Sequence, residues 1–226
     1  MSGVRASAHP GIQAVIFDWD GVLLESAEVK TQAFAELFRS IAPDRLEEIV
    51  AYHLAHMGLS RYVKFKHIYA RILRQPLSVR LERSLGRRFS RLVLTRLLEA
   101  PLVRGAKAFL RNARRMGTYR LFVASGAPED ELRVVAKAKG IWRQVAEWHG
   151  APKTKPRIIR DILARHALRP TEVAFVGDAA SDRRAADATG IVFIGRVVGP
   201  DGPLHGCRYL IRDLSELPSV LRRMTR

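Results

Sequence analysis

The sequence predicts an α/β fold, a doubly wound parallel sheet into which a helical segment is inserted. The apolar run "AVIFD" at 14–18 ends in a carboxylate and is typical of a buried strand. From about Ser26 to Leu98 the chain is rich in helix-forming residues at helical spacing and contains no convincing strand. After residue 100, strand and helix patterns alternate, which predicts a parallel sheet covered by helices on both faces.

Each element has its own signal in the sequence. Strand 14–18 comes first because its apolar residues are continuous. The inserted segment is helical because apolar residues recur three or four positions apart, as at Ala33, Leu37 and Ile41. Beyond it, apolar runs such as "YRLFVA" and "VAFVG" predict strands, and helical spacing predicts helices. These later elements are a helix at 106–116, a strand at 119–124, a helix at 129–139, a short edge element at 144–148, a helix at 156–166, a strand at 172–176, a helix at 182–189, strands at 191–194 and 208–211, and a last helix at 214–222. The cluster "GPDGP" at 199–203 predicts a surface turn.

Length and composition favour a globular protein. The chain has 226 residues, of which 47% are hydrophobic, enough for a sizeable core. The first thirteen residues lack the apolar run of a signal peptide, and no later stretch approaches the roughly 18 to 20 apolar residues of a membrane span. We therefore expect a soluble cytoplasmic protein with no membrane partner. The single Cys207 has no partner for an internal disulfide and no metal-ligand spacing.

The net charge of +17 is distributed along the chain. There is no run of five or six like charges, so we interpret the excess as a basic, solvated surface and expect no nucleic-acid partner. The summed field of such a surface attracts anionic ligands, phosphate esters included.

Polar residues collect where the predicted strands end. In open parallel sheets, ligands bind beyond the carboxyl ends of the strands. Any one of these residues is ordinarily explained by a helix cap, a turn or a solvated lysine, but their joint occurrence in this order predicts a functional site. The residues are Asp18, Asp20, Ser125, Gly126, Lys155, Asp178 and Asp182.

The first two of these residues raise an electrostatic problem. Asp18 and Asp20 are separated by one residue at the end of a buried strand, where two carboxylates repel each other and lose solvation unless a cation lies between them. A hard divalent cation with oxygen ligands would relieve this repulsion.

These motifs resemble those of the haloacid dehalogenase superfamily of phosphotransferases and phosphatases, over nearly the whole chain. "FDWDGVLLES" resembles the first motif, which implies that Asp18 is the nucleophile and Asp20 the general acid and base. "VASGAPEDEL" resembles the second motif, which implies that the Ser125 hydroxyl, supported by Gly126, binds the phosphoryl group. Relatives that cleave phosphonates or carbon–halogen bonds differ at the position of Asp20, so the chain resembles the phosphatase and mutase branches. Trp19 is bulky, and we expect it to serve packing.

The remaining two motifs supply a lysine and further carboxylates. Lys155 lies 23 residues before Asp178, a separation typical of the third-motif lysine, although Lys153 lies close enough to compete for this role. "VGDAASDRRAADATG" resembles the fourth motif, in which Asp178 ligates magnesium and Asp182 supports the metal or the lysine. The resemblance implies that Mg²⁺ is held by the Asp18 side chain, the Asp20 backbone carbonyl and Asp178.

The long insert after the first motif resembles the helical cap of the phosphoglycolate phosphatase and beta-phosphoglucomutase branch. This implies an α/β core domain at 1–24 and 101–226 and a helical cap domain at 25–100. Within the insert, Gly58 and Arg61 resemble a substrate-specificity loop, with Lys64 as a further substrate-binding residue.

A plainer interpretation of the insert also fits. The stretch "RYVKFKHIYARIL" at 61–73 has the pattern of an amphipathic helix with Phe65 inward and Lys64 solvated. Lys30 lies where the chain enters the insert and is placed to face a substrate. His53, His56 and His67 have no convincing zinc arrangement, so packing or surface roles are expected. The histidines therefore predict no metal site.

The expected function is a magnesium-dependent phosphatase. Its substrate would be a small phosphorylated metabolite, a sugar or sugar-acid phosphate, hydrolysed through an aspartyl-phosphate intermediate. Two alternatives stay open: a sugar phosphomutase that uses the same residues, and a non-catalytic binding protein on the same fold.

Overall fold

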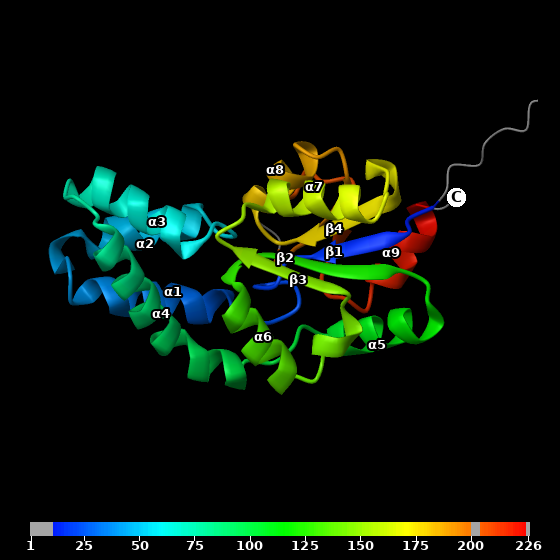
Figure 1. Ribbon diagram of the computed structural model, residues 1–226, viewed down its shortest axis with the longest axis horizontal. Helices are drawn as coiled ribbons and strands as arrows, with labels where there is room; N and C mark the ends of the chain where they lie inside the picture. The colour runs from blue at the N-terminus through cyan, green and yellow to red at the C-terminus, as the bar shows by residue number, and fades with distance from the viewer. Residues whose placement is uncertain (1–10, 200–203, 225–226) are drawn as a thin grey trace, which may run out of the picture.

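The computed structural model describes residues 11–199 and 204–224 (Figure 1). Its centre is a six-stranded sheet in the order β3-β2-β1-β4-β5-β6, with every neighbouring pair parallel. The strands are β1 (Ala14–Phe17), β2 (Arg120–Pro128), β3 (Glu147–Ala151), β4 (Val173–Gly177), β5 (Val192–Arg196) and β6 (Leu210–Ile211). The α-helices are α1 (Ala27–Arg39), α2 (Leu46–Ala55), α3 (Arg61–His67), α4 (Val79–Glu99), α5 (Ala106–Met116), α6 (Glu129–Ala138), α7 (Lys155–Arg165), α8 (Ala180–Asp187) and α9 (Leu217–Met224).

The predicted fold class is confirmed, with shifts at some boundaries. The edge element expected at 144–148 is a short 3₁₀ helix, Trp142–Gln144, followed by the edge strand β3. The helix expected through 61–73 changes to a π-helix at Ile68–Leu73. The turn expected at 199–203 lies, apart from Gly199, outside the described residues. No helix of the described residues combines the length and the apolar character needed to cross a membrane.

The alternation of side chains along β1 divides the core into two layers. Val15 and Phe17 belong to the layer beneath α5 and α6, where the Phe17 ring meets Phe109 edge to face, with centroids 5.9 Å apart. Ala14 and Ile16 belong to the other layer, beneath α7 and α8. Figure 1 shows these helix pairs on opposite faces of the sheet. Because both faces are covered, β1 is fully buried along its length, which explains its continuous apolar sequence.

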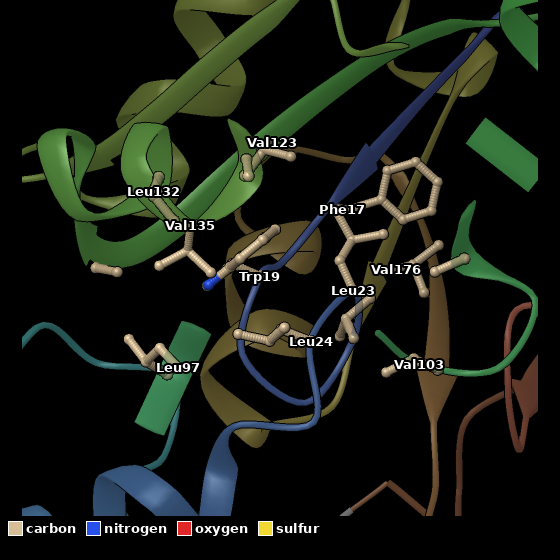
Figure 2. Packing of buried hydrophobic residues seen from close by; sticks show 14 of the residues in the cluster. Phe17, Trp19, Leu23, Leu24, Leu97, Val103, Val123, Leu132, Val135 and Val176 are labelled. Carbon is tan, nitrogen blue, oxygen red and sulfur yellow. The ribbon is translucent and has the colours of Figure 1, made fainter. Parts of the chain in front are cut away.

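Trp19 lies in the first of these layers, as the packing interpretation predicted. Its side chain is fully buried beside Leu24, Leu132 and Val135 (Figure 2). The indole also meets the ring of Trp148 on β3 edge to face, with centroids 5.6 Å apart. This large side chain therefore fixes the position of the backbone between Asp18 and Asp20.

Helices α1–α4, residues 27–99, form a helical segment at the carboxyl ends of the strands (Figure 1). An aromatic cluster holds the segment together. The Phe34 ring lies 4.8 Å from that of Phe89 on α4 and 5.8 Å from that of Phe65 on α3. Each buried Phe contributes about 1.5 to 3 kcal/mol to folding, and these residues belong to the same apolar cluster as Phe17 and Trp19.

The two connections between the helical segment and the sheet lie side by side. Leu24 and Leu102 form an antiparallel bridge. The N–H of Glu25 donates to the carbonyl of Pro101 at 3.0 Å, and the N–H of Val103 donates to that of Leu23 at the same distance. The chain therefore leaves and re-enters the sheet at one place.

Candidate active site

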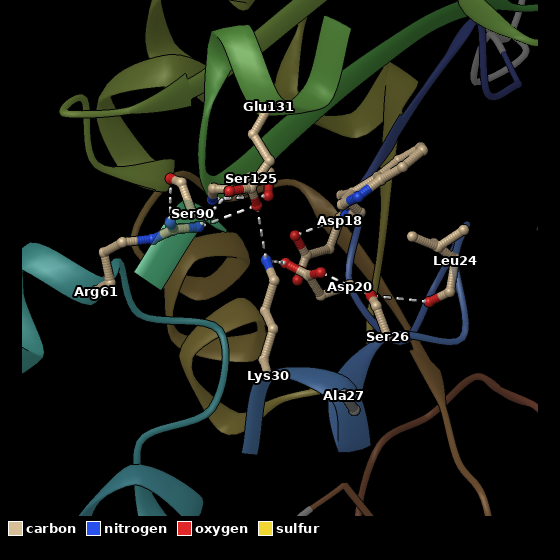
Figure 3. Close-up of polar contacts among 12 residues, drawn as sticks. Asp18, Asp20, Leu24, Ser26, Ala27, Lys30, Arg61, Ser90, Ser125 and Glu131 are labelled. Atoms are coloured by element: carbon tan, nitrogen blue, oxygen red, sulfur yellow. Dashed lines mark hydrogen bonds and ion pairs between the residues drawn. The ribbon is translucent and has the colours of Figure 1, made fainter. Parts of the chain in front are cut away.

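The loop after β1 points its two carboxylates in different directions (Figure 3). Asp18 is 1% exposed, and its Oδ1 accepts the N–H of Trp19 at 2.7 Å. The Asp20 carboxylate instead accepts the Ser26 hydroxyl at 2.7 Å and pairs with Lys30 of α1. The two carboxylates predicted as a pair therefore have separate partners.

Gly21 makes this loop possible. Its φ is +70°, and a Cβ there would lie 1.9 Å from Oδ2 of Asp178, so a side chain is excluded. Arg196, at the end of β5, stabilises this loop through two contacts. Its Nη1 donates to the Gly21 carbonyl at 2.6 Å, and its guanidinium pairs with Glu25 at 2.6 Å. These bonds hold the loop in a position where the Asp178 carboxylate lies against its backbone at Gly21.

Lys155, at the start of α7, joins the carboxylates. Its Nζ donates to Oδ2 of Asp18 at 2.8 Å and pairs with Asp182 of α8, whose other oxygen accepts the N–H of Ala179. Lys153, the competing lysine, lies on the surface and pairs with Asp161 at 3.3 Å. Of the two lysines, only Lys155 is bonded to Asp18.

The surroundings separate the proton affinities of these groups. Burial raises the pKa of Asp18 to about 7, helped by the charges of Asp182 and Asp20 and opposed by Lys155. Burial also raises the pKa of Asp178 well above its ordinary value, and Asp182 and Asp18 add to this rise. Burial alone would raise the pKa of Asp20 too, but the charge and hydrogen bond of Lys30 and the bond from Ser26 bring it below its ordinary value.

The pKa of Lys155 moves with its partners. Burial would lower it, but the charges of Asp18 and Asp182 outweigh burial and raise it. Lys155 is therefore a permanent cation in this site.

Three carboxylates form a cluster suited to a metal. Oxygens of Asp18, Asp178 and Asp182 lie within 4.8 Å of one another. The Asp178 carboxylate accepts no hydrogen bond from the described residues. The other two acids of the cluster, Asp18 and Asp182, both accept from Lys155. An acidic group that is partly buried and lacks a protein donor fits a hard divalent cation with oxygen ligands. The Asp20 carboxylate lies outside this cluster and is bonded to Lys30 instead.

Ser125 and Gly126 lie near the end of β2. The Ser125 side chain is fully buried, and its oxygen accepts the N–H of Ala127 at 3.0 Å, which orients the hydroxyl. Gly126 lies against the segment 57–60, which we call the Gly58 loop. A Cβ on Gly126 would lie 2.9 Å from the carbonyl oxygen of Gly58.

The Gly58 loop therefore rests directly on the core. Gly58 has a φ of +78°, and a Cβ there would lie 2.3 Å from Oγ of Ser181 and 3.2 Å from Nζ of Lys155. The Ser181 hydroxyl donates to the carbonyl of Met57 at 2.8 Å. The structure thus brings Gly58 to the predicted site, as a backbone contact.

A cavity lies between the helical segment and the loop after β1, and we call it the inner cavity. Its lining includes Asp18, Asp20, Lys30, Phe34, His53, Arg61, Lys64 and Gly126. A second hollow, on the outer side of the Gly58 loop, is lined among others by Ser125, Lys155, Ser181 and Arg184. Neither Asp18 nor Asp20 lines this outer hollow.

Lys64 is buried, so the interpretation that placed it in solvent is wrong for this residue. Its Nζ lies 3.1 Å from Nδ1 of His53 and 3.3 Å from the carbonyl oxygen of His53. Burial, with the nearby charge of Lys30, lowers the pKa of Lys64 to about 7. Phe65 is buried, as the amphipathic pattern predicted, and the next residue, Lys66, is exposed. His53 packs on the Phe34 ring, with centroids 4.2 Å apart.

Arg61 lines the inner cavity but is also bonded to other side chains. Its Nη2 donates to both carboxylate oxygens of Glu131 on α6, at 2.7 and 2.9 Å, and its Nη1 donates to Ser90 at 2.9 Å. Sequence reasoning missed Glu131 because an acid in the first turn of a helix is ordinarily explained by the helix dipole. It also missed Ser26 and Arg196. Ser26 directly precedes α1, and Lys30 follows it by four positions, so the two side chains lie on one face of the helix. This spacing is the signal that could have indicated a shared partner, which the structure shows to be Asp20.

Comparisons with known proteins agree with this architecture. The family of haloacid dehalogenase-like hydrolases matches residues 12–190. No curated protein matches the chain. A hydrolase from Pseudomonas syringae has a similar structure, with a TM-score of 0.76 and 17% identity over 94% of this chain and 99% of that one.

Two further solved structures are similar. A predicted phosphoglycolate phosphatase from Haemophilus somnus has a TM-score of 0.74 and 17% identity over 94% of this chain and 99% of its own. CbbY from Rhodobacter sphaeroides, solved in complex with phosphate, has a TM-score of 0.71 and 21% identity over 91% of this chain and 96% of its own. At these identities the likeness establishes the fold.

Proposed function

Since the chain belongs to the haloacid dehalogenase-like hydrolase family, we propose that this enzyme is a magnesium-dependent phosphatase that acts on a small phosphorylated metabolite. The observation that carries the proposal is the bond between Lys155 and Asp18 inside a cluster of carboxylates, two of which, Asp18 and Asp182, are buried. A lysine held on a buried carboxylate supplies a fixed positive charge where a phosphoryl group would meet its nucleophile.

Asp18 is the nucleophile in this proposal. One of its oxygens attacks phosphorus, the bond from phosphorus to the ester oxygen breaks, and an aspartyl-phosphate forms on Asp18. The Ser125 hydroxyl, oriented by its bond from Ala127, donates to a phosphoryl oxygen, and Lys155 balances the charge. Water then hydrolyses the aspartyl-phosphate and regenerates the carboxylate.

Mg²⁺ would be held by the Asp18 and Asp178 side chains and by the backbone carbonyl of Asp20, with Asp182 supporting Lys155. When bound, the cation reduces the repulsion between the Asp18 carboxylate and an anionic phosphate ester. The cluster of carboxylate oxygens, and Asp178 without a donor among the described residues, support this assignment.

Asp20 serves as general acid and base. Its carboxylate is held by Ser26 and Lys30 on the side of the inner cavity, away from the cluster that would bind the metal. From this position it would protonate the leaving oxygen and afterwards take a proton from the attacking water.

The inner cavity receives the leaving group. Its polar lining supports a sugar or sugar-acid phosphate, with Gly58, Arg61 and Lys64 as substrate-binding residues. The domain division also stays a proposal: a core at 1–24 and 101–226 performs the chemistry, and a cap at 25–100 covers it. We place the enzyme in the cytoplasm, without a nucleic-acid partner.

A panel of phosphorylated metabolites with Mg²⁺, assayed for phosphate release, tests the function. We expect at least one sugar or sugar-acid phosphate to be hydrolysed. Asp18→Asn should abolish turnover while the circular dichroism spectrum is retained, because it removes the nucleophile with little change in shape. Asp187→Asn, at an exposed position, is the matched control.

The same panel separates the alternatives. A mutase would return the phosphoryl group to a sugar after bisphosphate priming, without net phosphate release. A binding protein would release none under any condition. If Asp18→Asn turns over within about tenfold of the parent, roughly 1.4 kcal/mol of barrier, Asp18 is not the nucleophile.

A further inference from the structure

Four charged side chains of alternating sign run from the helical segment to the loop after β1. Arg61 pairs with Glu131, the Glu131 carboxylate lies 3.7 Å from Nζ of Lys30, and Lys30 pairs with Asp20 (Figure 3). Arg61 and Lys30 belong to helices α3 and α1 of the helical segment, whereas Glu131 belongs to α6, which covers the sheet. Glu131 is therefore the acid that connects two cations of the helical segment to the core.

The pair between Arg61 and Glu131 is almost completely removed from water. The exposed fractions of the two side chains are 3% and 5%. The guanidinium is further fixed by Ser90 and by the Phe89 ring, whose centroid lies 4.4 Å from Cζ of Arg61. A charge buried in this way is tolerable only while its partner is present, because removal of one partner leaves the other uncompensated.

The described arrangement is closed over the nucleophile. Asp18 is buried, the Gly58 loop touches Gly126 and Ser181, and the outer hollow is not lined by Asp18. A substrate that reaches Asp18 through the inner cavity must therefore enter while the helical segment stands away from the core. Such an opening separates α3 from α6, so the pair between Arg61 and Glu131 must part and form again in each cycle.

We propose that Glu131 is a positioning residue that latches the helical segment onto the core through Arg61. Closure restores the buried pair and brings Lys30 to Asp20, so the cavity is complete only when the latch is formed. Arg61 then contributes to turnover through closure, whatever further contact it makes with a substrate. This inference rests on the proposed function for its kinetic consequence, but the latch itself is a property of the fold.

A double-mutant cycle tests the latch. The variants are Arg61→Met, Glu131→Met and the double variant, with Glu131→Gln as a conservative change of similar shape. The matched control is Asp130→Asn, which removes the same charge at the adjacent exposed position of α6. Two quantities are measured: kcat and KM for 4-nitrophenyl phosphate with Mg²⁺, and deuterium uptake of residues 57–64 and 126–132 without substrate.

Arg61→Met should leave Glu131 with only the longer contact to Lys30, and Glu131→Met should leave Arg61 without its acid, so each single variant should populate the open arrangement. We expect kcat/KM to fall by about 10- to 100-fold in each single variant and deuterium uptake to rise in both segments. The double variant buries no unpaired charge at this place, so both quantities should move back toward the parent and lie closer to the parent than in either single variant. Asp130→Asn should match the parent.

Two results would overturn the latch. If the double variant is no more active than Arg61→Met, then Arg61 acts on the substrate itself. If no variant changes deuterium uptake, the pair does not hold the segment closed. Should a single Met variant fail to fold, Glu131→Gln and the double variant still decide the question. If the parent hydrolyses no phosphate ester, the proposed function fails, while the exchange measurement continues to support or refute the latch.

Discussion

Asp18 and Asp20 show how two identical side chains acquire different chemistry. Burial among other carboxylates raises the pKa of Asp18, whereas the direct partners Lys30 and Ser26 lower that of Asp20. One carboxylate therefore gains from a metal beside it, and the other already has its cation. The charged form that Lys30 and Ser26 favour at Asp20 is the form that accepts a proton, so this shift supports the role of Asp20 as a base.

Asp20→Ala should affect substrates according to their leaving groups. Loss of general acid catalysis costs about 10² to 10⁴-fold where the leaving oxygen needs a proton, as in a sugar phosphate. An aryl phosphate has a good leaving group and should lose less. Measurement of kcat/KM for both substrates checks this, and equal losses would show that Asp20 does not transfer the proton.

Lys64 should make the stability of the chain depend on pH. Its pKa of about 7 in the folded chain lies below the ordinary value of 10.5, so between these values the unfolded chain binds more protons. The free energy of unfolding should therefore rise with pH across this window, by at most about 1.4 kcal/mol per unit from this group.

Denaturation between pH 6 and 10 measures this slope. Lys64→Met should be more stable than the parent near pH 6 and should lose the part of the slope that Lys64 contributes. Lys66→Met, at an exposed position of the same helix, should keep the slope of the parent. Parallel curves for the parent and Lys64→Met would refute the shifted pKa.

Among the structural elements, the Gly58 loop leaves no room for a side chain at Gly58. A side chain at Gly58 needs an unfavourable positive φ and also displaces Ser181 and Lys155. Gly58→Ala should therefore cost about 1 to 3 kcal/mol in unfolding free energy and reduce kcat/KM at least tenfold, because the loop no longer closes on the core.

Gly117→Ala provides the control for this prediction. Gly117 has a similar φ of +61°, but a Cβ there meets no atom within 4 Å. It should lose stability through backbone strain and keep its activity. Chemical denaturation and steady-state kinetics of both variants distinguish the two effects, and an active Gly58→Ala variant would show that loop contact is dispensable.

The elements differ in how well the sequence could predict them. Strands β1 and β4 are buried on both faces, so their continuous apolar runs revealed them directly. Strand β3 lies at the sheet edge, and its half-exposed Glu147 and His149 hide the signal, which explains the shifted boundary. The partner of Arg61 is 70 residues away in the chain, so only tertiary structure could identify Glu131.

The candidate site, too, could be predicted only where the sequence pattern implied the contact. Asp18, Lys155 and Asp182 meet because parallel strands place their carboxyl ends at one edge, a consequence of topology that the alternating pattern already implied. The burial of Lys64 could not be foreseen, because a single helix pattern does not reveal which elements pack against its polar side.

At the scale of the whole molecule, metal binding should be coupled to stability. The carboxylate cluster repels itself in the folded chain, and an ion that binds only this state stabilises it by about 2.7 kcal/mol at a hundredfold excess over Kd. Mg²⁺ should raise Tm, EDTA should lower both Tm and phosphatase activity, and added Mg²⁺ should restore them. Asp178→Ala should shrink the Mg²⁺-dependent shift. An unchanged Tm together with full activity in EDTA would remove the metal from the mechanism.

The bridge between Leu24 and Leu102 has an evolutionary consequence. Because the two ends of this segment meet at one point, extra length within it need not move the strands, and each doubling of a flexible connection costs only about 0.6 kcal/mol in closure entropy. Length changes in exposed parts of the segment, away from Gly58, Arg61 and Lys30, can therefore accumulate without disturbing the strands that carry Asp18 and Asp178.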